Sequence, residues 1–145
     1  MKTSINIKKL HPDARIPTLG TLGAAACDLY SIDSYCLEPQ KHVLVRTGLA
    51  MTLPDNTAGL ILPRSGLALK QKITVLNSPG CLDPDYSGEV CVMLINFNEK
   101  KYVDIKKHDR IAQLLIIPKL SIIFNEVEDL ETTIRGAGGF GSTGV

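Results

Sequence analysis

Short apolar runs, each closed by residues that favour turns, are the feature that most restricts how this chain can fold. Gly, Pro, Asn or Asp stands at or near the ends of each run. Many short strands separated by frequent turns are typical of an all-β sandwich or barrel. The sequence therefore predicts an all-β fold, with strands at residues 42–53, 58–62, 73–76, 89–97, 102–105 and 111–117.

The run at residues 42–53 shows the strand pattern in most detail. Val43 and Val45 fall on one parity, and so does the later set that begins at Leu49. This alternation predicts a half-buried strand with a break near Gly48, followed by a turn at 54–56. The one convincing helical stretch, residues 66–72, is rich in good helix formers but only about two turns long. Helix is therefore expected to be a minor element.

The length and the charge of the chain limit the classes of partner. A chain of 145 residues corresponds to one domain, and folding at this length buries roughly two-thirds of the unfolded surface. The 16 basic and 15 acidic side chains are spread along the sequence and give no electrostatic reason to expect a nucleic-acid or membrane partner. The apolar stretches are too short to span a bilayer, and the start lacks the apolar core of a signal peptide. We expect a cytoplasmic protein, with entry into the nucleus if the source is eukaryotic or viral.

The cysteines and histidines give no metal-binding pattern. No C-x-x-C pair is present, and the three histidines do not stand at metal-ligand spacing beside the cysteines, which argues against a structural zinc site. Without an export signal, the better interpretation is four reduced, mostly buried thiols. These are Cys27, Cys36, Cys81 and Cys91.

The segment at residues 62–66 leads from an apolar strand into the predicted helix. A helix start offers unpaired N–H groups, and Arg64 and Ser65 add a guanidinium and a hydroxyl at the same place, which favours an anion site. The alternative is a structural turn in which Ser65 caps the helix and Arg64 pairs with a surface carboxylate. The segment alone does not decide between them.

Residues 77–88 form a turn-rich stretch ahead of the strand at 89–97. One interpretation is a hairpin connection, because Pro79-Gly80 and Asp83-Pro84 are turn dipeptides. The other is a recognition loop in which the Asn77 amide pairs with a base edge and a carboxylate holds a water molecule. Spacing alone does not show whether Asp83 or Asp85 faces inward.

The composition changes at Gly136, after which glycine becomes frequent. A segment of this kind cannot pack a core of its own, so an ordinary disordered end is one interpretation. The other is a flap in which Phe140 covers a flat ring, while Arg135 and the hydroxyls of Ser142 and Thr143 close on phosphates.

Taken together, these segments resemble a known family, the trimeric all-β dUTP pyrophosphatases, or dUTPases. The resemblance covers the whole chain. The segments match five motifs of that family in order and at compatible spacing, and this combination is highly specific. They are Ala25–Ser31, Pro63–Leu67, Asn77–Glu89, Arg110–Leu114 and Arg135–Gly144.

The resemblance implies a jelly-roll-type β-barrel over residues 1–134 and a Gly-rich arm over 135–145. It also implies a homotrimer with three active sites, each built from all three chains, in which the arm closes the site of a neighbouring subunit. The implied activity is hydrolysis of dUTP to dUMP and pyrophosphate, which keeps uracil out of DNA and supplies dUMP for dTMP synthesis. No nucleic acid or membrane partner is expected.

The resemblance also assigns roles to individual residues. Asp83 matches the general base that orients a water molecule toward the α-phosphorus, and Tyr86 matches the residue under the deoxyribose. Uracil would be read by Asn77 and by groups around Gly80, Cys81, Leu82 and Cys91. The phosphate contacts would come from Arg64, Ser65, Gly66 and Gln113, and the closing arm would contribute Arg135, Phe140, Gly141, Ser142 and Thr143.

The implied cofactor is Mg²⁺, held mainly by the triphosphate and steadied through water by Asp28. A hydrated ion that bridges phosphates needs few protein ligands, so the missing metal cage is no objection. The first motif departs from the family pattern at Ala26, where glycine is usual. If the backbone there needs a positive φ, alanine would strain it.

Two other readings predict different activities. A dCTP deaminase shares the fold, but it needs a proton-shuttling carboxylate where this chain has Met93. A catalytically idle dUTPase-like binding protein would be favoured by loss of Asp83, Gln113 or the arm, and all three are present. Release of pyrophosphate from dUTP, without ammonia, would separate these alternatives.

Overall fold

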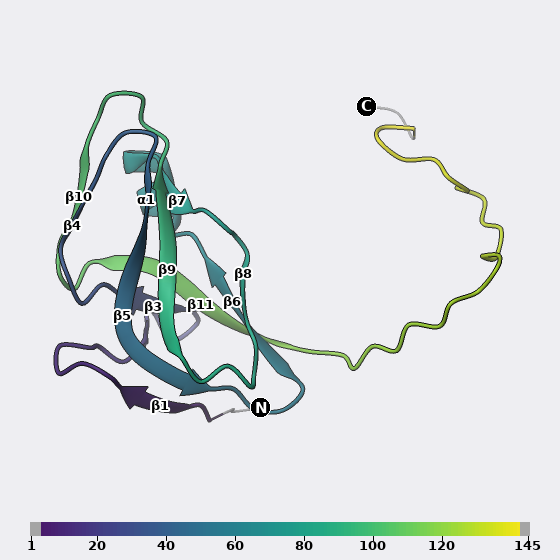
Figure 1. Ribbon diagram of the computed structural model, residues 1–145, viewed down its shortest axis with the longest axis horizontal. Helices are drawn as coiled ribbons and strands as arrows, with labels where there is room; N and C mark the ends of the chain where they lie inside the picture. The colour runs from purple at the N-terminus through teal and green to yellow at the C-terminus, as the bar shows by residue number, and fades with distance from the viewer. Residues whose placement is uncertain (1–3, 143–145) are drawn as a thin grey trace.

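The chain forms antiparallel β-sheets around one core, as Figure 1 shows for the computed structural model, which describes residues 4–142. One sheet has the order β1 (Asn6–Lys9), β5 (His42–Thr52), β9 (Glu89–Asn96) and β7 (Ile73–Val75). The largest has the order β2 (Thr18–Leu19), β3 (Cys27–Tyr30), β11 (Arg110–Pro118), β6 (Thr57–Leu62) and β8 (Gly80–Leu82). The third pairs β10 (Val103–Ile105) with β4 (Tyr35–Leu37).

The prediction of an all-β, jelly-roll-type fold with one short helix is confirmed. Strands that are neighbours in a sheet are mostly distant in sequence, so the chain crosses repeatedly between sheets as jelly-roll folds require. Every predicted strand is present, and no end differs from the prediction by more than one residue. The sequence analysis missed β1, β2, β3, β4 and β8, which have only two to four residues each.

The core is built by alternation along the strands. In β9, Val90, Val92 and Leu94 are at most 1% exposed, while Cys91 and Met93 between them are only partly buried. In β5, the break expected at Gly48 is a register shift in its pairing with β9. Gly48 has a φ of +69°, and an added Cβ would lie 3.0 Å from the side chains of Ala14 and Ile32. Glycine therefore suits this position both conformationally and sterically.

The helix α1 (Ser65–Gln71) begins one residue earlier than predicted and buries none of its residues. Its N-cap is Arg64, which makes no side-chain capping bond, so the interpretation of Ser65 as the cap is wrong. The helix ends at Lys72, which adopts a left-handed conformation with a φ of 53°. Within the described residues, no helix is long and apolar enough to cross a membrane.

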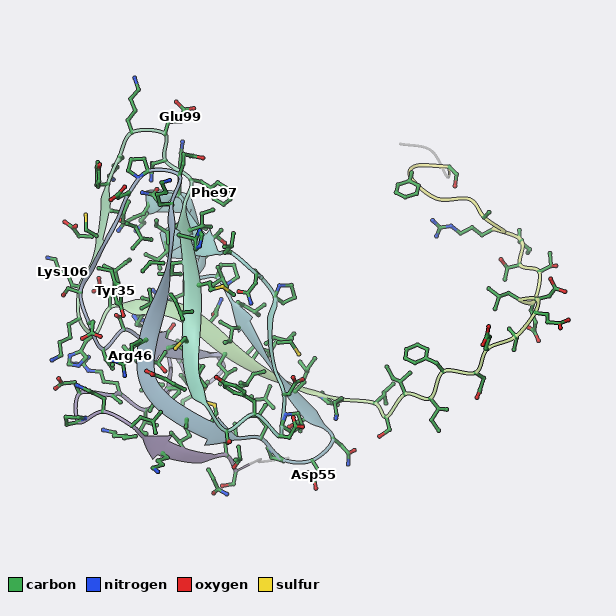
Figure 2. All side chains as sticks on the ribbon, viewed as in Figure 1. Tyr35, Arg46, Asp55, Phe97, Glu99 and Lys106 are labelled. Atoms are coloured by element: carbon green, nitrogen blue, oxygen red, sulfur yellow. The ribbon has the colours of Figure 1, made fainter. Side chains whose placement is uncertain are left out.

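The chain leaves the sheets after β11. From residue 119 to residue 142 it forms neither helix nor strand, and it runs away from the sheets as an extended segment (Figure 1). In Figure 2 the side chains of this segment stand clear of the sheets. Many of them are large and apolar, namely Leu120, Ile122, Ile123, Phe124, Val127, Leu130, Ile134 and Phe140, and each is at least 57% exposed.

The expectation of mostly buried thiols is wrong. All four cysteines are unpaired, but Cys36 and Cys81 are exposed and Cys27 and Cys91 are only partly buried. The physical reason is that successive side chains of a strand point to opposite faces. Cys36 and Cys81 are the middle residues of β4 and β8, and in each strand the two flanking residues face inward or pack against neighbours.

Candidate active site

The turn-rich loop and the start of β9 enclose a cavity of about 320 Å³, which we call the loop pocket. It lies where β8 pairs with β6 and faces β9, so its walls come from both large sheets. Every residue that the sequence analysis assigned to the base, the sugar or the attacking water lies along this pocket. These residues are Asn77, Gly80, Cys81, Leu82, Asp83, Tyr86 and Cys91.

Tyr86 is fixed in the loop pocket by two neighbours. Its hydroxyl donates a hydrogen bond to the Glu89 carbonyl at 3.0 Å. Its ring lies against Gly88, where an added Cβ would be only 2.5 Å from the tyrosine oxygen. The Glu89 side chain in turn accepts the Gly48 N–H at 2.8 Å and pairs with Arg46 Nε at 3.1 Å. The loop is therefore tied to the break in β5.

Asp83, and not Asp85, lines the loop pocket, which resolves the alternative left open by the spacing. The Cys81 thiol donates a weak hydrogen bond to the Asp83 carboxylate, with Sγ 3.9 Å from Oδ1. Asp83 is exposed, so its oxygens are accessible to water. An accessible carboxylate of this kind can accept a proton from a water molecule.

Asn77 and Gly80 face each other at the far side of the loop. An added Cβ at Gly80 would lie 3.2 Å from the Asn77 amide nitrogen, so glycine leaves room for that side chain. Gly80 also pairs with Ile61 of β6, which anchors the loop to the largest sheet. The amide therefore stands beside a backbone edge, which suits recognition of a planar polar group.

Burial raises the pKa of the Cys91 thiol, and the nearby Glu89 adds to this effect. Burial likewise raises the pKa of the Cys27 thiol. Thiols with raised pKa values stay protonated at neutral pH and are poor nucleophiles. Cys91 therefore contributes shape and backbone groups to the loop pocket, and not covalent chemistry.

A second cavity, of about 210 Å³, lies at one end of the largest sheet, and we call it the arginine pocket. The strand register explains its composition, because Gln113 of β11 is paired with Asp28 of β3 on one side and with Leu62 of β6 on the other. Gln113 Nε2 also donates to the Pro63 carbonyl at 2.9 Å. The pocket collects the predicted residues Asp28, Arg64, Ser65, Gly66 and Gln113, together with Gly20, Ala24, Ala26 and Arg110.

Asp28 is the centre of an ion-pair group in the arginine pocket. Its Oδ1 accepts Arg64 Nε at 2.8 Å, and its Oδ2 accepts Arg110 Nη1 at 3.2 Å. Only 8% of Asp28 is exposed. The interpretation that Arg64 pairs with a surface carboxylate is thus wrong in one respect, because its partner is buried and lies inside the pocket.

The arginine pocket has the donor set of an anion site. It offers two guanidinium groups, a hydroxyl and an amide against a single carboxylate. No group of three His, Cys, Asp or Glu side chains within residues 4–142 could hold a metal ion. This donor set fits a polyanion, and Asp28, the one carboxylate that lines the pocket, could hold a hydrated Mg²⁺ ion that such a ligand would carry. Ala26 is not among the residues with positive φ, so alanine brings no left-handed strain at this position.

The loop pocket and the arginine pocket share no residue. The arm residues Arg135, Phe140, Gly141 and Ser142 line neither of them, and Thr143 lies outside the described residues. Arg135 Nε instead donates to the Gly138 carbonyl at 2.8 Å, and Phe140 is fully exposed. One subunit therefore presents three separate groups of candidate site residues.

Arg110 and Glu89 are the two charged pocket residues that were not predicted as site residues. Arg110 begins a segment that the sequence analysis had singled out, but its position beside Asp28 depends on the pairing of β3 with β11. Glu89 ends the turn-rich loop, and its contacts with β5 are equally long-range. The sequence signal that could have identified both residues was the motif resemblance, since each lies within a segment that resembles the family.

Comparisons with known proteins agree with this geometry. A family model for dUTPase matches residues 12–144. A deoxyuridine 5'-triphosphate nucleotidohydrolase of Hydrogenobaculum sp. (strain Y04AAS1) is 48% identical over 140 residues, which cover 96% of each chain. One from Nautilia profundicola is 49% identical over 140 residues, covering 97% of this chain and 98% of its own.

Solved structures give the same result at the level of the fold. The structure of the Staphylococcus bacteriophage 80alpha dUTPase with dUPNHPP matches with a TM-score of 0.91 and 27% identity, covering 99% of this chain and all of the other. The family match spans most of the chain, and the two bacterial relatives match it almost end to end. The chain belongs to the dUTPase family.

Proposed function

We propose that this dUTP nucleotidohydrolase cleaves dUTP to dUMP and pyrophosphate by attack of water on the α-phosphorus, with Asp83 as general base. The observation that carries the proposal is the loop pocket, where an accessible carboxylate, an amide and a tyrosine ring converge in one cavity. Asp83 accepts a proton from the water as the oxygen attacks. The bond between the α-phosphorus and the bridging oxygen breaks, and pyrophosphate leaves.

The other side chains of the loop pocket select the nucleotide. The Asn77 amide can both donate and accept, which suits the polar edge of uracil. The narrow loop around Gly80 and Cys91 leaves no room for the methyl group of thymine. Tyr86 lies under the sugar, where its fixed ring excludes a 2'-hydroxyl by shape. Selectivity thus depends on the contacts that hold the loop.

The arginine pocket binds the phosphates. Arg64, Ser65, Gly66 and Gln113 supply donors to the phosphate oxygens, which positions the α-phosphorus for in-line attack. Asp28 would hold the water shell of a Mg²⁺ ion carried by the triphosphate, and that ion would neutralise part of the phosphate charge. The site therefore needs no resident metal.

The complete site requires more than one subunit. The loop pocket and the arginine pocket are separate in one chain, and the arm touches neither. The segment from residue 119 onward also exposes many large apolar side chains, which a lone subunit leaves in water. A homotrimer in which each site takes the loop pocket, the arginine pocket and the arm from different chains accounts for both features.

The experiment is a nucleotide-specificity assay of the purified protein with Mg²⁺ present and then chelated. We expect pyrophosphate from dUTP, little from dCTP, dTTP or UTP, and a large loss of rate on chelation. Ammonia release from dCTP would instead indicate a deaminase, and nucleotide binding without turnover would indicate an idle relative. A wild-type protein that leaves dUTP intact would refute the proposal.

A further inference from the structure

Glu89 lines the loop pocket, but the proposed function gives its side chain no task. It is the first residue of β9, and its side chain is only 20% exposed. Each carboxylate oxygen has a partner on β5, since Oε1 accepts the Gly48 N–H at 2.8 Å and Oε2 accepts Arg46 Nε at 3.1 Å. Hydrogen bonds to a carboxylate are among the strong ones in proteins, so a side chain held at both oxygens is suited to positioning.

The bond to Gly48 falls at the irregular point of β5. Arg46 pairs with Cys91 and Ala50 pairs with Glu89, so four steps along β5 match two steps along β9, and β5 carries two extra residues there. A bulge takes backbone groups out of the strand ladder, and a buried group without a partner is costly. Gly48 is buried, and Glu89 supplies the acceptor for its N–H. The carboxylate therefore fixes the bulge of β5 to the start of β9.

The backbone around Glu89 holds Tyr86 at the same point. The Glu89 carbonyl accepts the Tyr86 hydroxyl at 3.0 Å, and the preceding residue, Gly88, lies against the tyrosine ring. Tyr86 is 45% exposed, so burial in the core does not fix its ring. A movement of Glu89 would therefore shift the surface on which the ring rests.

We propose that the Glu89 carboxylate is a positioning residue for sugar selection. It holds the end of the loop against the bulge of β5, and the loop end holds the Tyr86 ring where it excludes a 2'-hydroxyl. The proposal rests on the proposed function, because it names what sets the selectivity of the same pocket. Glu89 acts on the loop backbone and not through the tyrosine hydroxyl alone, so the ring of Tyr86→Phe still rests against Gly88.

The test is the ratio of kcat/KM for dUTP to that for UTP. Glu89→Ala removes both contacts with β5, Glu89→Gln keeps an oxygen for the Gly48 N–H, and Arg46→Gln removes only the ion pair. The matched control is Glu99→Gln. Glu99 is an exposed carboxylate on the loop between β9 and β10 (Figure 2), and it lines neither the loop pocket nor the arginine pocket.

Glu89→Ala should lower the ratio by about fivefold, the factor that corresponds to the net contribution of one hydrogen bond. Glu89→Gln and Arg46→Gln should each lower it by about twofold, because one of the two contacts remains. Glu99→Gln should keep the wild-type ratio. A wild-type ratio in Glu89→Ala would overturn the role of Glu89. Thermal unfolding checks that each variant folds, and the two milder variants decide the case if Glu89→Ala does not.

A double-mutant cycle with Tyr86→Ala separates positioning from a general loosening of the fold. Without the ring, Glu89 has nothing to position, so adding Glu89→Ala to Tyr86→Ala should leave the remaining ratio unchanged. A merely structural role would lower the ratio by the same factor with the ring or without it. That additive result would overturn the positioning role.

Binding measurements keep this proposal apart from the proposed function. Isothermal titration calorimetry gives the affinities for the imido analogue dUPNHPP and for its ribose counterpart without turnover. If the wild type prefers the deoxy analogue, Glu89→Ala loses that preference and dUTP is not hydrolysed, the proposed function fails while the role of Glu89 stands. If the wild type hydrolyses dUTP and Glu89→Ala matches it in both ratios, the inference about Glu89 is wrong while the proposed function stands.

Discussion

Replacing Gly88 by alanine should disturb sugar selection while leaving the fold nearly as stable as before. The added Cβ would lie 2.5 Å from the oxygen and 2.7 Å from Cζ of Tyr86. Non-bonded heavy atoms prefer to be about 3.5 Å or more apart, so the phenol must move by about 1 Å. That movement breaks its hydrogen bond to the Glu89 carbonyl, which is already 3.0 Å long.

The cost in stability should be small. A lost hydrogen bond of this type costs about 1 kcal/mol net. The ring is 45% exposed and can turn into solvent, so no core cavity opens. Gly88 is not in the left-handed region, and alanine there recovers about 0.4–1 kcal/mol by restricting the unfolded chain. The free energy of unfolding should therefore change by no more than about 1 kcal/mol.

The assay is the ratio of kcat/KM for dUTP to that for UTP. We expect this ratio to fall by about tenfold in Gly88→Ala, because the ring no longer blocks the 2'-hydroxyl. Tyr86→Phe should keep the ratio, since exclusion depends on shape. Gly23→Ala serves as a control, because nothing lies within 4 Å of its added Cβ and Gly23 lines neither pocket. A Gly88→Ala enzyme with wild-type selectivity and a shifted Tyr86 would refute the reasoning.

Three further predictions concern the base, the arm and the thiols. Asp83→Asn should bind dUTP but lose about a hundredfold or more in kcat. A loss of kcat in Asp85→Asn instead would contradict the assignment of Asp83 as the general base. Truncation before Arg135 should leave a folded oligomer with heavily reduced dUTP hydrolysis. Phe140→Ala should lose less activity, and Phe140→Trp should keep much of it, because stacking needs only a flat ring. A fully active truncated enzyme would mean that the arm is an ordinary disordered end. Because burial raises the pKa of Cys91, its labelling by iodoacetamide should be slow at neutral pH and should rise as pH approaches that raised pKa. The labelling rate is measured by mass spectrometry, and a rate that does not change with pH would contradict the prediction.

The strand pattern predicted the long strands because their alternation is a local signal. The run at 42–53 became β5, with its break at Gly48, and the run at 89–97 became β9. Strands of two to four residues carry too few side chains to show a period, so β2 and β8 could not be found this way. β8 exists because its backbone pairs with β6, a long-range contact.

The candidate site was predictable in its membership but not in its geometry. Motif resemblance named 12 of the 21 residues that line the two pockets, and among them every polar one except Arg110 and Glu89. It could not show that the pockets are separate, or that Asp28 pairs with two arginines, because both facts depend on strand register and on ion pairs across the sheet. The exposure of Cys36 and Cys81 was missed for a similar reason. In a three-residue strand, the pairing with the neighbouring strand decides which side chains face the core.

The central claim is that one active site takes its loop pocket and its arginine pocket from different subunits. The most direct measurement mixes two inactive chains, Asp83→Asn and Arg64→Gln, and follows dUTP hydrolysis after verified subunit exchange. If the pockets come from different chains, random trimers from an equal mixture contain about a quarter of their sites with both residues intact, and the mixture should regain about a quarter of the wild-type rate. Activity no higher than the sum of the two separate variants would show that each subunit holds a complete site and would contradict the account.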